Sequence, residues 1–142
     1  MDNVDLAYCA GFFDGEGSVL IREKRKGDRV HHGVQASIQQ NDPYVLAFFR
    51  DVVNVGNVTS YVGASGNRIW RWQTSGKDAG LAMELLLPHL KLKKEEARIA
   101  IEFAASIGNV GTYQTSEVLM MRRNLYTKYK HTIEQRRLIS HG

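Results

Sequence analysis

The chain lacks several features that would point to particular chemistries. It contains a single cysteine, Cys9, which excludes an internal disulfide and a cysteine zinc site and fits a reducing compartment. No run of about 18 apolar residues is present, so we expect no membrane span. Repeats and low-complexity tracts are also absent. The acidic start resembles neither a signal peptide nor a transit peptide, which predicts an intracellular protein encoded by a bacterium, a phage or an organelle.

Length and charge set broad limits on the fold and its partners. A chain of 142 residues predicts one domain, 1–142, with a real hydrophobic core. Apolar residues make up 43% and charged residues 24%, which is typical of a globular protein. Nineteen basic residues against 15 acidic ones give a net charge of +4 and a pI near 9.3. This moderate basic excess suits a polyanionic partner without proving one.

The hydrophobic periodicity predicts an α+β fold. Helices are expected over about 2–13, 44–53, 76–87, 94–107 and 116–133, and strands over about 18–24, 34–39, 58–62 and 68–74. The resulting order is an αββαββα core, about 4–107, followed by a C-terminal helical extension, about 112–138. We expect four antiparallel strands with the helices on one face. The other face of such a sheet is left in water and needs its own explanation.

One stretch, residues 9–18 with the sequence CAGFFDGEGS, stands out at the boundary of the first helix and first strand, and it occurs once. Its glycines permit a sharp bend and close approach of another backbone. Ala7, Gly11 and Gly15 recur every four residues and share one helical face, where small residues let two helices pack closely. Cys9 and Phe13 form part of an apolar stripe suited to the core.

This stretch resembles the motif that names the LAGLIDADG homing endonucleases. An active enzyme of that family places two motif helices side by side, so a single copy implies a homodimer. By this resemblance Glu16 matches the metal-binding acid, usually aspartate in the family, and the Gly15 carbonyl can complete the metal shell. Asp14 matches the acid that caps or braces. The resemblance implies a dimer interface formed by Ala7, Ala10, Gly11, Asp14 and Gly15.

Three later segments, at 38–42, 71–79 and 85–94, extend the resemblance over about residues 5–107. They match Gln40 to a glutamine that positions a catalytic water and Lys93 to an active-site lysine, with Lys91 and Lys94 as alternatives for that role. The implied cofactor is Mg²⁺, while Ca²⁺ could bind without supporting cleavage. Metals held by Glu16 and its symmetry mate would activate water, and Lys93 would stabilise charge or assist proton transfer.

The wet face of the sheet is rich in arginine, lysine and glutamine. Arginine and glutamine pair bidentately with base edges in the major groove, whereas lysine mainly contacts phosphate. The predicted DNA-binding residues are Arg22, Lys24, Arg25, Gln35, Ser37, Gln39, Arg68, Arg71 and Gln73. In the fourth strand we take Trp70 and Trp72 as inward and Arg71 and Gln73 as outward. The opposite register, with Arg68 outward, stays open.

The sequence therefore predicts a homodimeric homing endonuclease that cleaves both strands of a long, nearly palindromic double-stranded DNA site and leaves 3′ overhangs, as the family does. Two alternatives use the same fold: an RNA maturase that binds an intron RNA, and a DNA-binding regulator that does not cleave. The basic C-terminal helix either supports the sheet or touches flanking phosphates, and its sequence does not decide between them.

Overall fold

The computed structural model describes residues 2–108 and 115–141, and its elements follow the predicted α+β order. The helices are α1 (Asn3–Glu16), α2 (Pro43–Val53), α3 (Gly76–Leu86), the short 3-10 helix η1 (Leu87–His89), α4 (Lys94–Ala105) and α5 (Ser116–His141). The strands are β1 (Gly17–Lys26), β2 (Arg29–Gln40), β3 (Asn57–Val62) and β4 (Arg68–Ser75). Most of the glycine-rich link expected at 108–111, and the expected start of the C-terminal extension near 112, lie outside the described residues.

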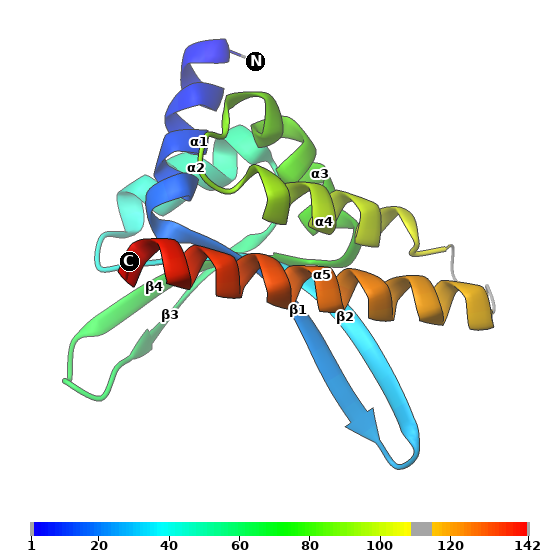
Figure 1. Cartoon of the computed structure of the whole chain (residues 1–142). Helices are drawn as coiled ribbons and strands as arrows, with labels where there is room; N and C mark the ends of the chain where they lie inside the picture. Colours follow the sequence, from blue (N-terminus) through cyan, green and yellow to red (C-terminus); the bar gives the residue numbers. More distant parts are fainter. Residues whose placement is uncertain (1, 109–114, 142) are drawn as a thin grey trace.

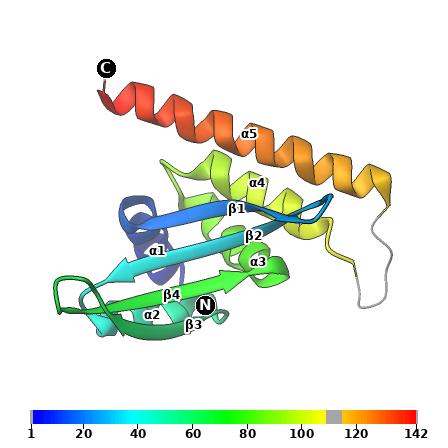
Figure 2. The same cartoon turned by 90° about the horizontal axis from the view of Figure 1, so that it is seen from below.

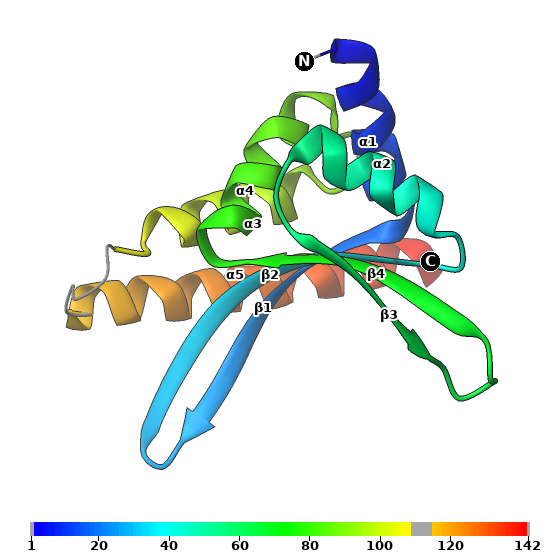
Figure 3. The same ribbon diagram turned by 180° about the vertical axis from the view of Figure 1, so that it is seen from behind.

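The four strands form one antiparallel sheet in the order β1-β2-β4-β3. Helices α1 to α4 cover one face of this sheet (Figures 1 and 3). Helix α5 runs beside the β1 edge, next to α4 (Figure 2). No helix in the described part of the chain is both long enough and apolar enough to cross a bilayer.

Alternation along the strands separates a buried face from an exposed one. Val19 and Ile21 of β1 are buried, and Trp72 of β4 has no exposed surface. The indole nitrogen of Trp72 donates a hydrogen bond to the Val55 carbonyl at 2.9 Å. Its ring also meets Phe49 edge-on, with ring centroids 4.7 Å apart. These contacts fix Trp72 in the core and settle the register of β4 that the sequence left open.

Both hairpins extend away from the helical layer and diverge (Figures 1 and 3). Strands β1 and β2 pair without interruption from Gly17↔Ile38 to Lys26↔Arg29, so both are longer than predicted. The turn between them uses Gly27 at φ +64°, a backbone conformation that glycine adopts without steric cost. Inter-strand hydrogen bonds sustain these strands beyond the last core residues, where the hydrophobic pattern gives no signal.

Two of the helices begin at carboxylate N-caps. The carboxylates of Asp2 and Asp42 accept hydrogen bonds from the amides of Val4 at 2.9 Å and Tyr44 at 2.8 Å. The C-terminal ends differ more. Helix α1 continues to Glu16, past the expected end near residue 13, and α5 continues to His141 instead of ending near 133.

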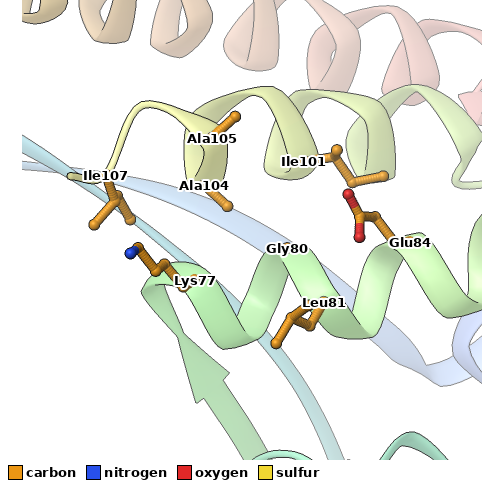
Figure 4. A pocket seen from close by; sticks show the side chains of 8 residues that line it. All are labelled: Lys77, Gly80, Leu81, Glu84, Ile101, Ala104, Ala105 and Ile107. Carbon is orange, nitrogen blue, oxygen red and sulfur yellow. The ribbon is translucent and has the colours of Figure 1, made fainter. Parts of the chain in front are cut away.

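Helices α3 and α4 approach each other closely because Gly80 lies against Ala104. A Cβ added at Gly80 would fall 2.4 Å from the Ala104 Cβ, so a side chain there would force the helices apart. A shallow groove of about 330 Å³ lies beside this contact, between Leu81 and Ile101 (Figure 4). No residue of the CAGFFDGEGS stretch lines the groove.

Candidate active site and nucleic-acid interface

The site begins with Asp14, near the end of α1. Its carboxylate accepts hydrogen bonds from three consecutive backbone amides, those of Lys91 at 2.7 Å, Leu92 at 3.1 Å and Lys93 at 3.0 Å. Hydrogen bonds to a charged acceptor are stronger than neutral ones, so this contact fixes the 91–93 segment against α1. Asp14 thus braces the chain, as the resemblance implied, and its carboxylate is occupied within the protomer.

Lys93 follows from this arrangement. It precedes the first residue of α4, and its side-chain ammonium donates hydrogen bonds to the carbonyls of Phe13, at 3.3 Å, and Gly17. Those carbonyls lie on either side of Glu16 in the chain. Burial lowers the pKa of Lys93 below its ordinary value, and the nearby carboxylates of Glu96, Asp14 and Glu16 oppose that shift. The half-buried lysine is therefore held at the end of the motif helix. Lys91, one of its two alternatives, is exposed.

Glu16 is the last residue of α1 and is exposed. In the described part of the chain its carboxylate accepts no hydrogen bond, in contrast to that of Asp14. The negative end of the helix dipole adjoins it, which favours a cation there. A carboxylate with the nearby Gly15 carbonyl provides hard oxygen donors of the kind that Mg²⁺ prefers. Among residues 2–108 and 115–141, no group of three or more His, Cys, Asp or Glu side chains could hold a metal.

Gln40 ends β2 beside the same junction. Gly17, the first residue of β1, pairs with Ile38 of β2. Gln40 lies two residues further along β2 than Ile38. It is partly exposed and stands opposite Trp70 of β4. No hydrogen bond joins it to Glu16 or Lys93 among the described residues. The fold therefore brings Gln40 to the end of α1, while its role toward a water stays a prediction.

The outward side of α1 carries the small residues expected at a dimer seam. Ala7, Gly11 and Gly15 are exposed, and a Cβ added at either glycine would meet nothing within 4 Å. Val4 and Tyr8, 72% and 57% exposed, lie on α1 as well. One interface prediction needs correction: Ala10 has no exposed surface, because it faces the core of its own protomer, so it is not available to a second copy.

The exposed face of the sheet holds most of the predicted DNA-binding residues. Alternation places them in rows across β1, β2 and β4: Arg22, Lys24, Gln35, Ser37, Gln39, Arg71 and Gln73. Ser37 pairs with Gln73 and Gln39 with Arg71 in the β2–β4 ladder. The Ser18 and Ser37 hydroxyls are 3.4 Å apart across β1 and β2. These side chains thus share one polar, basic surface, which is named here the outer face.

Two residues predicted for this surface lie elsewhere. Arg25 falls on the opposite face of β1 from Arg22 and Lys24, where it lines a cavity of about 450 Å³ with Arg123 of α5. Arg68 shares the parity of Trp72, and its guanidinium donates a hydrogen bond to the Ser60 hydroxyl at 2.9 Å. Arg25 was included as part of the basic hairpin, and Arg68 as the alternative register of the fourth strand, whereas the two-residue alternation of a strand decides the face.

Sequence reasoning missed Tyr61 of β3. Its ring lies 5.3 Å from the Arg71 guanidinium carbon, and its hydroxyl is 3.2 Å from the Gln39 amide. We assign the Gln39 amide oxygen toward Arg71, because that orientation gives the guanidinium an acceptor. Tyr61 therefore holds two predicted base-reading side chains on the outer face. The alternation of β3, which places Asn57, Thr59 and Tyr61 on one side, was the available signal.

Comparison with solved structures identifies the fold, although no protein-family model matches the sequence. The homing endonuclease I-CvuI, solved with a DNA target in 2 mM Mg with the DNA not cleaved, is similar over 88% of this chain and 79% of that one, with a TM-score of 0.74 and 21% identity. An archaeal intron-encoded homing endonuclease complexed with DNA matches over 92% of this chain and 85% of that one, with a TM-score of 0.77 and 18% identity.

The homing endonuclease I-TnaI matches over 92% of this chain and 96% of that one, with a TM-score of 0.67 and 18% identity. By contrast, the match to the LAGLIDADG homing endonuclease I-GzeII, solved with a DNA target, covers 85% of this chain but 42% of that one, with a TM-score of 0.67 and 16% identity. The chain has the fold of the LAGLIDADG homing endonucleases, with four antiparallel strands under a layer of helices.

Proposed function

We propose that this chain is a site-specific DNA endonuclease, a homing endonuclease of the LAGLIDADG type, that acts as a homodimer with Mg²⁺. One observation carries the proposal. The ammonium of Lys93 is hydrogen-bonded to the carbonyls of Phe13 and Gly17, on either side of the exposed Glu16. The exposed carboxylate of Glu16 and the nearby ammonium of Lys93 lie at the edge of a basic, polar sheet. This arrangement is better explained by phosphodiester cleavage than by a role in packing.

The residues divide the work of hydrolysis. Glu16, with the Gly15 carbonyl, would hold the metal, which when bound supplies Lewis acidity toward the phosphate and the attacking water. Lys93 stabilises the negative charge that develops on the phosphate, or assists proton transfer. Gln40 orients the water through its amide. Asp14 contributes indirectly by fixing the 91–93 segment.

A homodimer would supply the second set of groups. One chain carries one motif helix, and the outward side of α1 is lined by small residues and by exposed Val4 and Tyr8. The match to I-GzeII covers 42% of that chain, so this chain corresponds to somewhat less than half of it. Two α1 helices in contact would bring two Glu16 carboxylates together, where a divalent cation offsets their repulsion.

The outer face would read the DNA. Arg71, Gln39 and Gln73 have the side chains that pair bidentately with base edges, and Arg22 and Lys24 extend along the β1–β2 hairpin toward phosphates. A twofold protein reads two related half-sites, so the target is long and nearly palindromic. Cleavage of both strands would leave 3′ overhangs.

The test uses the full chain and a randomised double-stranded DNA library with Mg²⁺, followed by sequencing of the cleaved ends. We expect cuts at one related set of sites, with paired ends that report a 3′ overhang and the symmetry of the site. Glu16→Gln should lower the cleavage rate at least about 10²–10³-fold, because it removes charge stabilisation from the transition state. With Ca²⁺ the same sites should be bound without being cut.

The possible failures point to different alternatives. Selective binding of DNA without cleavage in Mg²⁺ would identify a non-cleaving regulator. Preference for a structured RNA over every selected DNA would favour the maturase. Cleavage that is unchanged in Glu16→Gln would show that the chemistry lies elsewhere.

A further inference from the structure

The far end of α5 makes a charged contact beside the candidate active site. Arg136 donates from Nε to Glu96 Oε2 at 2.9 Å and from Nη2 to Glu96 Oε1 at 2.7 Å. The same Nη2 donates to the Leu92 carbonyl at 2.8 Å. Helix α5 packs next to α4, the helix that carries Glu96. Arg136 therefore binds the backbone directly before Lys93, although it lies 44 residues further along the chain.

The 91–93 segment is thereby held from two sides. Asp14 binds its three amides from α1, and Arg136 binds the Leu92 carbonyl from α5. Lys93, which follows Leu92 directly, donates hydrogen bonds from its ammonium to the carbonyls of Phe13 and Gly17. Loss of the hydrogen bonds with either Asp14 or Arg136 would let the backbone that carries Lys93 shift relative to Glu16.

Glu96 makes the contact more than a structural tie. Its side chain is 3% exposed, and a buried carboxylate needs a partner because burial of an unpaired charge is costly. Lys93 lies close enough for the charges of both Glu96 and Arg136 to influence its pKa. Without Arg136, Glu96 would become an unpaired anion near Lys93 and would draw the ammonium away from the end of α1.

We propose that Arg136 is a positioning residue for DNA cleavage: it occupies the Glu96 carboxylate and fixes the Leu92 carbonyl, and so keeps Lys93 directed at the junction of α1 and β1. The inference rests on the proposed endonuclease function for its catalytic consequence. It assigns α5 a part in active-site geometry, one that the helix's basic composition did not reveal.

The test compares Arg136→Ala with a double variant, Arg136→Ala/Glu96→Gln, in the full chain. We expect Arg136→Ala to slow single-turnover cleavage about 10–100-fold, the range of one misplaced catalytic group, with the dissociation constant for DNA changed less than about twofold. The double variant should recover at least about tenfold of that loss, because Glu96 no longer carries a charge that diverts Lys93. Removal of the unpaired buried charge would also restore stability, so the unfolding of both variants is measured beside the rate. A role limited to stability predicts that the rate follows the folded fraction, whereas the positioning role predicts slow cleavage by fully folded Arg136→Ala.

Glu95→Gln is the matched control. Glu95 also pairs with a basic residue of α5, Lys128, at 3.3 Å, but its side chain is 42% exposed and makes no contact with Leu92. This variant should cleave at the wild-type rate. If Arg136→Ala fails to fold, Arg136→Lys, which keeps the charge but not the forked contact, should show a smaller loss of rate. A wild-type rate in Arg136→Ala or in Arg136→Lys would overturn the proposal, as would a loss confined to DNA affinity.

Amide hydrogen exchange tests whether Arg136 holds the 91–93 segment, and this measurement does not require cleavage activity. In Arg136→Ala the amides of Lys91, Leu92 and Lys93 should exchange at least about tenfold faster, while those of the β2–β4 ladder keep wild-type protection. If wild type cleaves no DNA, the endonuclease function fails, and this exchange pattern still decides whether Arg136 holds the segment. Unchanged exchange at these three amides would refute the positioning role in either case.

Discussion

The two sides of helix α1 differ sharply in how their residues are used. On the inward side, Cys9 and Phe13 have no exposed surface, and near the end of the helix Asp14 accepts three backbone hydrogen bonds. On the outward side, Gly11 is exposed, and a Cβ added there would meet no described residue within 4 Å. Glu16, the last residue of the helix, is exposed as well. Two acids two residues apart thus have opposite situations. The comparison teaches that the buried residues and Asp14 maintain the fold, whereas the exposed residues contribute little to it and, under the proposed function, would serve a second copy, a metal and DNA.

The largest effect on stability should come from Asp14. Replacement by Asn removes the charge that three amides share, and we expect the free energy of unfolding to fall by about 3 kcal/mol. Denaturant unfolding would measure it. The matched control is Asp51→Asn, at an exposed acid on α2, which should stay within about 0.5 kcal/mol of wild type. Equal losses in both variants would mean that Asp14 is no more than a surface acid.

The buried thiol of Cys9, on the inward side of α1, should make the stability of the protein depend on pH. Burial, with a smaller contribution from the Asp5 carboxylate, raises the pKa of its thiol from 9.0 to about 11. Between those values the unfolded chain releases a proton that the folded chain retains, so stability is complete below pH 9 and falls as pH rises through 11. At about 1.4 kcal/mol per pKa unit, the loss approaches about 2.7 kcal/mol.

Denaturant unfolding at several pH values between 8 and 11.5, on the order of half a unit apart, would record this loss. Cys9→Ala should show a flatter profile over the same range, because it has no thiol to ionise. If wild type and Cys9→Ala lose stability in parallel, another group is responsible.

Gly11 tests the outward side. A methyl group there would meet none of the described residues within 4 Å, and replacement of a helical glycine by alanine stabilises a helix by about 1 kcal/mol. If α1 packs on a second α1, however, the methyl should separate the two helices and weaken the dimer. Sedimentation equilibrium over a concentration series should therefore show weaker association for Gly11→Ala than for wild type. A wild-type chain that stays monomeric at micromolar concentration with its target DNA would break the two-copy account.

The smallest effect concerns the β1–β2 hairpin. Successive side chains of β1 alternate there between the outer face and the opposite face of the sheet. Arg22→Ala or Lys24→Ala should each reduce the slope of log affinity against log salt by about 0.9, the value for one lost phosphate contact. Arg25→Ala is the matched control because Arg25 points to the other face, and it should leave the slope unchanged. Equal changes in slope for all three would show that charge alone, and not the face, governs DNA binding.

Much of this architecture was predictable from local pattern. Hydrophobic periodicity predicted the element order, and the inward placement of Trp72 in β4 was also correct. Ala10 was misassigned because one-dimensional spacing cannot say which neighbouring helices cover a face. Arg25 was placed with the DNA-binding residues because its charge took priority over its parity in β1, and Arg68 because the sequence alone left the register of β4 open. Contacts that join distant segments, such as Arg136 with Glu96, leave no local signal.

The central claim is that Glu16 and Asp14, though only two residues apart in the motif, have separate roles: Glu16 in the chemistry and Asp14 in support of the fold. The most direct measurement compares Glu16→Gln and Asp14→Asn for thermal unfolding and single-turnover cleavage of one selected DNA site in Mg²⁺. We expect Glu16→Gln to keep the wild-type melting temperature and lose cleavage, while Asp14→Asn melts several degrees lower, as about 3 kcal/mol implies for a domain of this size. A Glu16→Gln variant that cleaves at the wild-type rate, or an Asp14→Asn variant as stable as wild type, would contradict the account.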